Sequence, residues 1–119
     1  ILNLPGPYIR PHGCLLIGRF EGIPVGCVAY QKLSSEICEM KRLYVLPEYR
    51  GHGFGQKIVD RIISEAKNTT YTLMRLDTFA YYEADIHHYK QVGFYEIPAY
   101  QKYEASDVLF FEKQLKDVH

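Results

Sequence analysis

The sequence predicts an α/β fold with one mixed, mostly antiparallel sheet. Two helix patterns are separated by a strand pattern, and the other strand patterns come in neighbouring pairs. A helix that joins two successive strands normally makes them parallel, whereas strands joined by a tight turn pair antiparallel. A glycine-rich segment stands between the third strand and the first helix. This order predicts one parallel strand pair inside an otherwise antiparallel sheet.

The first half of the chain carries three strand patterns. Residues 1–13 are rich in proline and glycine, which predicts a loop or an arm. Apolar runs at 14–20 and 23–31 flank Glu21-Gly22, a turn signal, and therefore predict a β-hairpin. The third strand is predicted at 37–45.

Charged residues occupy both faces of the strand predicted at 37–45. By strand alternation Glu39 and Lys41 point to one side and Arg42 to the other. Burying a charged side chain costs free energy unless the charge is paired or serves a function. Either this strand borders a cleft, or Glu39 forms an ion pair with Lys41 or Arg42.

The second half alternates helix and strand. Apolar residues recur with helical spacing from Phe54 to Ala66, and Asn68-Thr69-Thr70 closes this helix. A second helix is predicted at 82–92, because Gly93 suits a helix C-terminus. The remaining strands are predicted at 71–77, 94–97 and 108–115, with a polar loop at 100–107.

Size and composition restrict the class of protein. The 119 residues predict a single domain, and a formal net charge of zero argues against a general binder of nucleic acid. No apolar run approaches the roughly 20 residues of a membrane span. Three cysteines inside strand patterns are an odd number and predict buried thiols in a reducing compartment. We therefore expect a cytoplasmic protein that binds neither nucleic acid nor a membrane.

The segment Arg50-Gly51-His52-Gly53-Phe54-Gly55 has glycines at alternate positions before a helix. Glycine permits close approach of the backbone to a ligand, and the free N–H groups of a helix start favour a phosphate. The third glycine comes one residue too early for the dinucleotide motif, and Gln56-Lys57-Ile58 does not complete a mononucleotide loop. The alternative to a phosphate site is a plain glycine turn that only starts the helix.

The same segment matches Arg/Gln-x-x-Gly-x-Gly/Ala and resembles the acetyl-CoA loop of the GNAT superfamily of acyltransferases. Residues 38–45 resemble the central strand of that family, and residues 74–78 resemble the strand after its first helix. Residues 89–94 match the Tyr-x-x-x-Gly-Phe end of its next helix. The resemblance covers residues 13–115 and implies a GNAT-like acyl-CoA N-acyltransferase fold, with the parallel strand pair splayed at the cofactor site.

This resemblance implies acetyl transfer from acetyl-CoA to a primary amine of a small molecule, peptide or protein, by direct attack in a ternary complex. The Val45 N–H would polarise the thioester carbonyl, while Leu43 and Val45 hold the pantetheine arm. No metal is expected, because the adjacent His87 and His88 cannot face one ion from a helix. The implied cofactor-binding residues are Leu43, Tyr44, Val45, Arg50, Gly51, His52, Gly53, Phe54, Gly55, Gln56 and Tyr82.

Two catalytic residues are also implied by the resemblance. Glu39 corresponds to a glutamate that serves as general base in several family members, often through water, with an ion pair as the alternative. Tyr89, four residues before Gly93, corresponds to a tyrosine that protonates the departing thiolate, with core packing as the alternative. Asp85 stands where relatives usually carry a small apolar residue, and the sequence offers no explanation for it.

The family normally has another strand and one or two helices before its first hairpin, whereas about a dozen residues precede Cys14. We expect residues 1–119 to form one GNAT-like domain without those elements, and homodimer formation stays open. The acceptor pocket is expected near Tyr81 and the segment 98–107, whose aromatics allow an apolar or cationic acceptor. The alternative function is a non-catalytic CoA-binding sensor or partner-binding module of the same fold.

Overall fold

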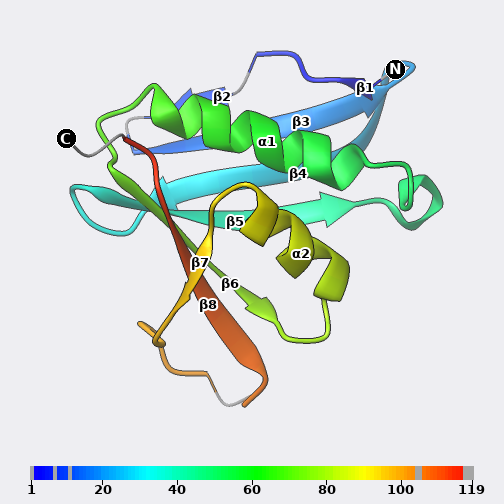
Figure 1. Ribbon diagram of the computed structural model, residues 1–119. Coiled ribbons are helices and arrows are strands. Elements are labelled where there is room, and N and C mark those ends of the chain that lie inside the picture. The colour runs from blue at the N-terminus through cyan, green and yellow to red at the C-terminus, as the bar shows by residue number, and fades with distance from the viewer. Residues whose placement is uncertain (1, 7, 11, 104–105, 117–119) are drawn as a thin grey trace.

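One eight-stranded sheet runs through the computed structural model, and both helices lie against one of its faces (Figure 1). The structure describes residues 2–6, 8–10, 12–103 and 106–116. The strand order is β1-β3-β4-β5-β6-β8-β7, and β2 also pairs with β3. The elements are β1 Leu2–Asn3, β2 Tyr8–Arg10, β3 Gly13–Phe20, β4 Ile23–Lys32, β5 Ile37–Val45, the 3-10 helix η1 Pro47–Tyr49, α1 Phe54–Lys67, β6 Leu73–Phe79, α2 Glu83–Gln91, β7 Tyr95–Ile97 and β8 Val108–Gln114.

The pairing of the strands confirms the predicted mixed topology. β5 and β6, which α1 connects, are parallel, and the other described pairs are antiparallel. β5 and α1 have the predicted bounds, whereas β6 begins and ends two residues later than the predicted 71–77. Tyr71 is instead a buried residue that precedes β6 and donates a hydrogen bond from its Oη to the His12 carbonyl at 2.9 Å.

The prediction of a loop or arm at the N-terminus is wrong for residues 2–3 and 8–10. β1 pairs with the end of β3 at Phe20 and Arg19, and β2 pairs with its beginning. The many prolines and glycines favour a loop. They carry no information about the edge of β3, with which these two segments pair. Short strands therefore form where tertiary contact overrides local composition.

The core lies between the sheet and α1. The apolar stripe of α1 is buried as its spacing predicts and packs on β3, β4 and β5. Gly26 permits this approach, because a Cβ there would come within 2.9 Å of Ile58 Cδ1. Cys14, Cys27 and Cys38 are free thiols, and burial raises the pKa of each, that of Cys38 to about 12.

β5 is irregular at Arg42, whose backbone has φ 60°. The register with β4 shifts from Ala29↔Lys41 to Cys27↔Tyr44, so one extra residue of β5 bulges out of the ladder. The alternation predicted for the whole strand is therefore wrong beyond Lys41. Parallel pairing with β6 covers only Ile37–Glu39, after which the two strands separate. The bulge and the short pairing together confirm the splayed parallel pair.

Candidate active site

Two cavities adjoin the separated part of β5. The strand cavity, about 500 Å³, lies between β5 and β6, and the loop cavity, about 570 Å³, lies beside the glycine segment. Their linings share Leu43, Tyr82 and Asp85, so the two spaces meet where α2 begins. The strand cavity is lined by residues 40–43, 76–79, 82, 85, 89, 103 and 108, and the loop cavity by residues 43–45, 49–51, 53–56, 82, 84 and 85.

Backbone groups dominate the glycine end of the loop cavity. Gly51 and Gly53 have φ values of 83° and 78°, a left-handed conformation that glycine adopts without strain. Gly53 is the N-cap of α1, and neither a capping side chain nor an acidic residue occupies the first turn. The first N–H groups of α1 and its positive dipole end are therefore free to receive an anion.

The end of β5 presents backbone groups to the side from which β6 has diverged. The Leu46 N–H donates to the Val25 carbonyl at 2.8 Å, so these residues form a hydrogen-bonded pair. Their neighbours Gly26 and Val45 are then a non-hydrogen-bonded pair, which directs the Val45 N–H and carbonyl away from β4. Arg50 Nε donates to that carbonyl at 2.8 Å, which leaves the Val45 N–H available.

The predicted cofactor residues gather around one cavity. Apart from His52, all of them line the loop cavity. His52 is exposed, and its ring centroid lies 5.9 Å from that of Phe54. Tyr49, Ala84 and Asp85 also line the cavity and are absent from the predicted cofactor residues. Tyr49 directly precedes Arg50, so its position next to the glycine segment was the available signal.

Tyr89, the predicted acid, lies on α2 and lines the strand cavity. Only 5% of its surface is exposed, and its ring packs edge-on against Phe94 at a centroid distance of 5.8 Å. Burial raises the pKa of the phenol, and the charge of Asp85 raises it further. The phenol is therefore a proton donor rather than a phenolate, and it combines core packing with access to the cavity.

Glu39, the predicted base, is 1% exposed and is absent from the linings of both cavities. Its Oε2 accepts hydrogen bonds from Tyr100 Oη at 2.6 Å and Gln101 Nε2 at 3.0 Å. Its Oε1 lies 3.1 Å from Lys41 Nζ, an ion pair whose angles do not satisfy a hydrogen bond. The structure thus contains the ion pair that the sequence offered as the alternative.

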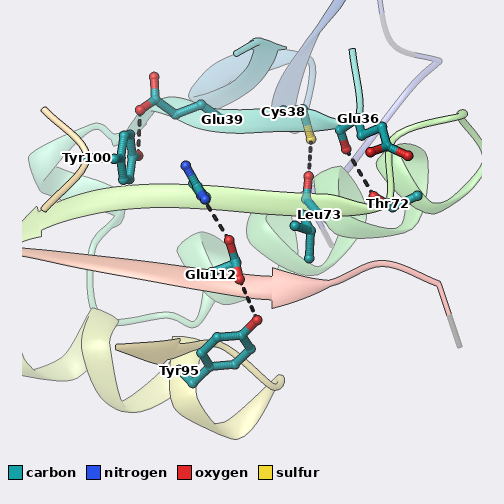
Figure 2. A network of polar contacts seen from close by, with 9 residues as sticks. Glu36, Cys38, Glu39, Thr72, Leu73, Tyr95, Tyr100 and Glu112 are labelled. Atoms are coloured by element: carbon teal, nitrogen blue, oxygen red, sulfur yellow. Dashed lines mark hydrogen bonds and ion pairs between the residues drawn. The ribbon is translucent and has the colours of Figure 1, made fainter. Parts of the chain in front are cut away.

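Glu39 begins a row of polar side chains across the sheet face opposite the helices. Arg75 Nε pairs with Glu112 Oε1 at 2.9 Å, and Tyr95 Oη donates to Glu112 Oε2 at 2.6 Å. The Arg75 guanidinium lies 5.0 Å from the Tyr100 ring centroid. Figure 2 shows Tyr100 reaching Glu39 and Tyr95 reaching Glu112 from opposite ends of this row. Contacts of Tyr100 with Glu39 and Arg75 therefore hold the segment after β7 against β5 and β6.

The same segment closes one side of the strand cavity. Tyr103 Oη donates to Asp77 Oδ2 at 2.8 Å, and both residues line that cavity. The hydrogen bond, followed by burial, raises the pKa of Tyr103 to about 12. The expected acceptor region at 98–107 therefore does contribute to the cavity, although residues 104–105 lie outside the described part. Tyr81 is exposed and stacks on Phe79 at a centroid distance of 5.1 Å.

Other types of site find no support in the described ranges. Within them, no group of three or more His, Cys, Asp or Glu side chains could hold a metal ion. His88 instead pairs through Nε2 with Asp60 Oδ1 of α1 at 2.9 Å. No helix in these ranges is long and apolar enough to cross a membrane.

Comparisons with a family model and with curated proteins give matches over most of this chain. The model of the acetyltransferase (GNAT) family matches residues 4–94. An uncharacterized N-acetyltransferase of Dictyostelium discoideum is 43% identical over 82 residues, which are 68% of this chain and 38% of that protein. Another uncharacterized N-acetyltransferase, from Schizosaccharomyces pombe, is 36% identical over 91% of this chain and 68% of its own length. The chain therefore spans well under half of the first relative and about two thirds of the second.

Solved structures share the arrangement of the elements. A structure from Klebsiella pneumoniae has a TM-score of 0.79 at 29% identity and matches 91% of this chain and 77% of its own. A family member from Elizabethkingia anophelis, described with acetyl-CoA bound, has a TM-score of 0.77. The match covers 95% of this chain and 97% of that one, and at 14% identity it concerns the fold alone.

Proposed function

Because the chain belongs to the acetyltransferase (GNAT) family, we propose that it transfers an acetyl group from acetyl-CoA to a primary amine by direct attack in a ternary complex. The observation that carries this proposal is the junction of the two cavities at Leu43, Tyr82 and Asp85. A donor in one cavity and an acceptor in the other would meet there, as direct attack requires.

In this proposal the loop cavity receives acetyl-CoA. The free N–H groups at the start of α1 bind the pyrophosphate, and the glycines leave room for it. The pantetheine arm extends along the end of β5, and the Val45 N–H donates to the thioester oxygen as negative charge develops there. The acetyl-CoA bound by the Elizabethkingia anophelis protein of similar fold supports this choice of donor.

The strand cavity receives the amine. The amine nitrogen attacks the thioester carbon, the C–S bond breaks, and the Tyr89 phenol gives its proton to the departing sulfur. Tyr89 suits this step because it lines the cavity and burial keeps it protonated. The base role of Glu39 stays a prediction, and its burial means that any proton would reach it through water.

The decisive experiment combines binding with turnover. Calorimetry should detect acetyl-CoA binding that is tighter than binding of ATP or NAD. Free thiol is then followed with acetyl-CoA and a panel of primary amines: an alkylamine, a diamine, an amino acid and a peptide with a free N-terminus. We expect thiol release that depends on at least one of these amines.

Two results would contradict the proposal. Tight acetyl-CoA binding without amine-dependent thiol release would indicate a CoA sensor or partner-binding module instead. Tighter binding of ATP or NAD than of acetyl-CoA would indicate a general nucleotide-binding domain.

A further inference from the structure

Asp85 occupies an unusual place on α2. It lies in the first turn, and among the acidic residues of the described chain it alone lines both cavities. Leu43 and Tyr82 accompany it at the junction, and neither is an acidic residue. Any negative charge at the meeting point of donor and acceptor therefore comes from Asp85.

Its carboxylate is also uncommitted, in contrast to the other two acidic groups nearby. Glu39 is held by Tyr100, Gln101 and Lys41, and Asp77 accepts a hydrogen bond from Tyr103. In the described ranges Asp85 takes part in no side-chain hydrogen bond and no ion pair. A carboxylate that lines both cavities without a partner of its own is suited to a cationic group that arrives from outside.

We propose that Asp85 receives the ammonium group of the acceptor at the junction of the two cavities and accepts its proton. This inference rests on the proposed acetyl transfer, and it identifies the carboxylate that deprotonates the acceptor before the attack. The aromatic residues Phe79, Tyr82 and Tyr103 in the same cavity add faces against which a cation is stabilised. The acceptor is accordingly an amine that arrives protonated.

The proton balance of the reaction is complete with two residues. The ammonium gives one proton to the Asp85 carboxylate and becomes a neutral amine, whose lone pair forms the C–N bond. The C–S bond breaks, the thiolate takes the Tyr89 proton, and the acylated nitrogen returns its second proton to Tyr89 through water. Asp85 releases its proton to solvent. Acetyl-CoA and the ammonium thus become amide, thiol and one free proton.

The surroundings of Asp85 agree with this role. Although the residue is exposed, partial desolvation raises the pKa of its carboxyl, and the nearby His88 lowers it by a smaller amount. The other ionisable groups around the strand cavity are Lys41 and Arg42 from β5, Asp77 from β6, and Tyr82, Tyr89 and Tyr103. A carboxylate with a raised pKa is a stronger base, and Tyr89 follows Asp85 by one helical turn on the same face of α2.

The raised pKa also allows activity and folding to be separated. When folding raises the pKa of a carboxyl, the ionised form destabilises the fold, and this cost appears as the pH rises through the folded pKa. At neutral pH, Asp85→Asn removes that cost. The change also removes the favourable interaction of the carboxylate with the start of α2, so the two effects oppose each other. The variant should therefore melt close to the temperature of the wild type, and a thermal melt beside the kinetics checks that a loss of turnover does not reflect unfolding.

The test compares Asp85→Asn with Glu83→Gln, which makes the same change at an exposed position of the same helix outside both linings. Thiol release is measured with acetyl-CoA and the best amine of the panel. We expect kcat/KM for the amine to fall about 100-fold in Asp85→Asn at neutral pH. Glu83→Gln should stay within about twofold, and neither change should alter acetyl-CoA affinity by more than that.

The pH profile supplies the signature of the role. Wild type binds the protonated amine, so kcat/KM should be level between the pKa of Asp85 and that of the amine. Asp85→Asn can use only the amine that is already deprotonated in solution. Its kcat/KM should therefore rise about tenfold per pH unit until the amine is fully deprotonated. An unchanged rate, or a deficit that is the same at every pH, would overturn the inference. Absence of amine-dependent thiol release in wild type would instead contradict the proposed function.

Discussion

The two cavities of this domain are similar in volume but differ in what lines them. The loop cavity, about 570 Å³, is bounded mainly by residues between positions 43 and 56, three of them glycines, and also by residues 82, 84 and 85 at the start of α2. The strand cavity, about 500 Å³, is bounded by side chains from β5, β6, α2, β8 and the segment that carries Tyr103. Backbone donors remain in place after most side-chain substitutions, whereas a cavity formed by side chains loses a group with each substitution. Variants of the two cavities should therefore behave differently.

The largest effect is expected from the backbone of the loop cavity at Val45. Val45→Pro removes the N–H that we propose polarises the thioester, and this N–H makes no ladder bond to β4 that would be lost as well. Turnover should fall about 10²–10³-fold, the usual cost of one such donor. Val45→Ala keeps the N–H and should remain within a few-fold of wild type. Equal losses in the two variants would refute the backbone role.

Tyr89→Phe tests the side-chain cavity at its proposed acid. The change removes one oxygen and keeps the packing against Phe94, so kcat should fall about 100-fold while acetyl-CoA affinity is nearly unchanged. Since burial raises the pKa of Tyr89 above its ordinary value, wild-type kcat should show no alkaline decline from this group near pH 10. Steady-state kinetics across pH and calorimetry check both points. A kcat for Tyr89→Phe that equals wild type would remove Tyr89 from the mechanism.

Glu39→Gln and Tyr100→Phe together test how the wall of the strand cavity is held. Glu39→Gln removes the charge that strengthens the 2.6 Å contact with Tyr100, and Tyr100→Phe removes the contact itself, so each should lower the free energy of unfolding by about 2 kcal/mol. If Glu39 only anchors this wall, both variants should raise the KM for the amine and keep the wild-type pH profile. If Glu39 is the base, only Glu39→Gln should abolish turnover and alter the profile. Denaturant unfolding and kinetics on the two variants distinguish these outcomes.

The sequence predicted most of the loop cavity, because ten of its thirteen lining residues lie between positions 43 and 56. The segment Arg50 to Gly55 runs from the end of η1 into the first turn of α1, and β5 and α1 were both predicted close to their observed bounds. Consequently the positions of these ten residues followed once those two elements were known, whereas the three at the start of α2 depend on tertiary contact. The free N–H groups at the helix start depend on the same local geometry.

The strand cavity could not be predicted in the same way, because its walls meet only through tertiary contacts. Asp77 and Tyr103 are 26 residues apart and are joined by a hydrogen bond that no local pattern announces. Glu39 looked like a candidate base by its position on β5, but Tyr100 and Gln101, more than 60 residues away, close over it. The sequence shows Asp85 only as a departure from the residue type that is usual at this position. The structure shows that it lines both cavities.

The smallest effect is expected from Gln56→Glu, in the first turn of α1. A negative charge there interacts favourably with the helix dipole, so the free energy of unfolding should stay level or rise by a few tenths of a kcal/mol. The same charge repels a pyrophosphate bound at the helix start, so acetyl-CoA affinity should fall about three- to tenfold and recover partly at high salt. Gln114→Glu makes the same change on β8, outside the loop cavity, and should leave affinity unchanged. Calorimetry at two salt concentrations measures this, and an affinity insensitive to Gln56→Glu would mean that the phosphates bind elsewhere than at the start of α1.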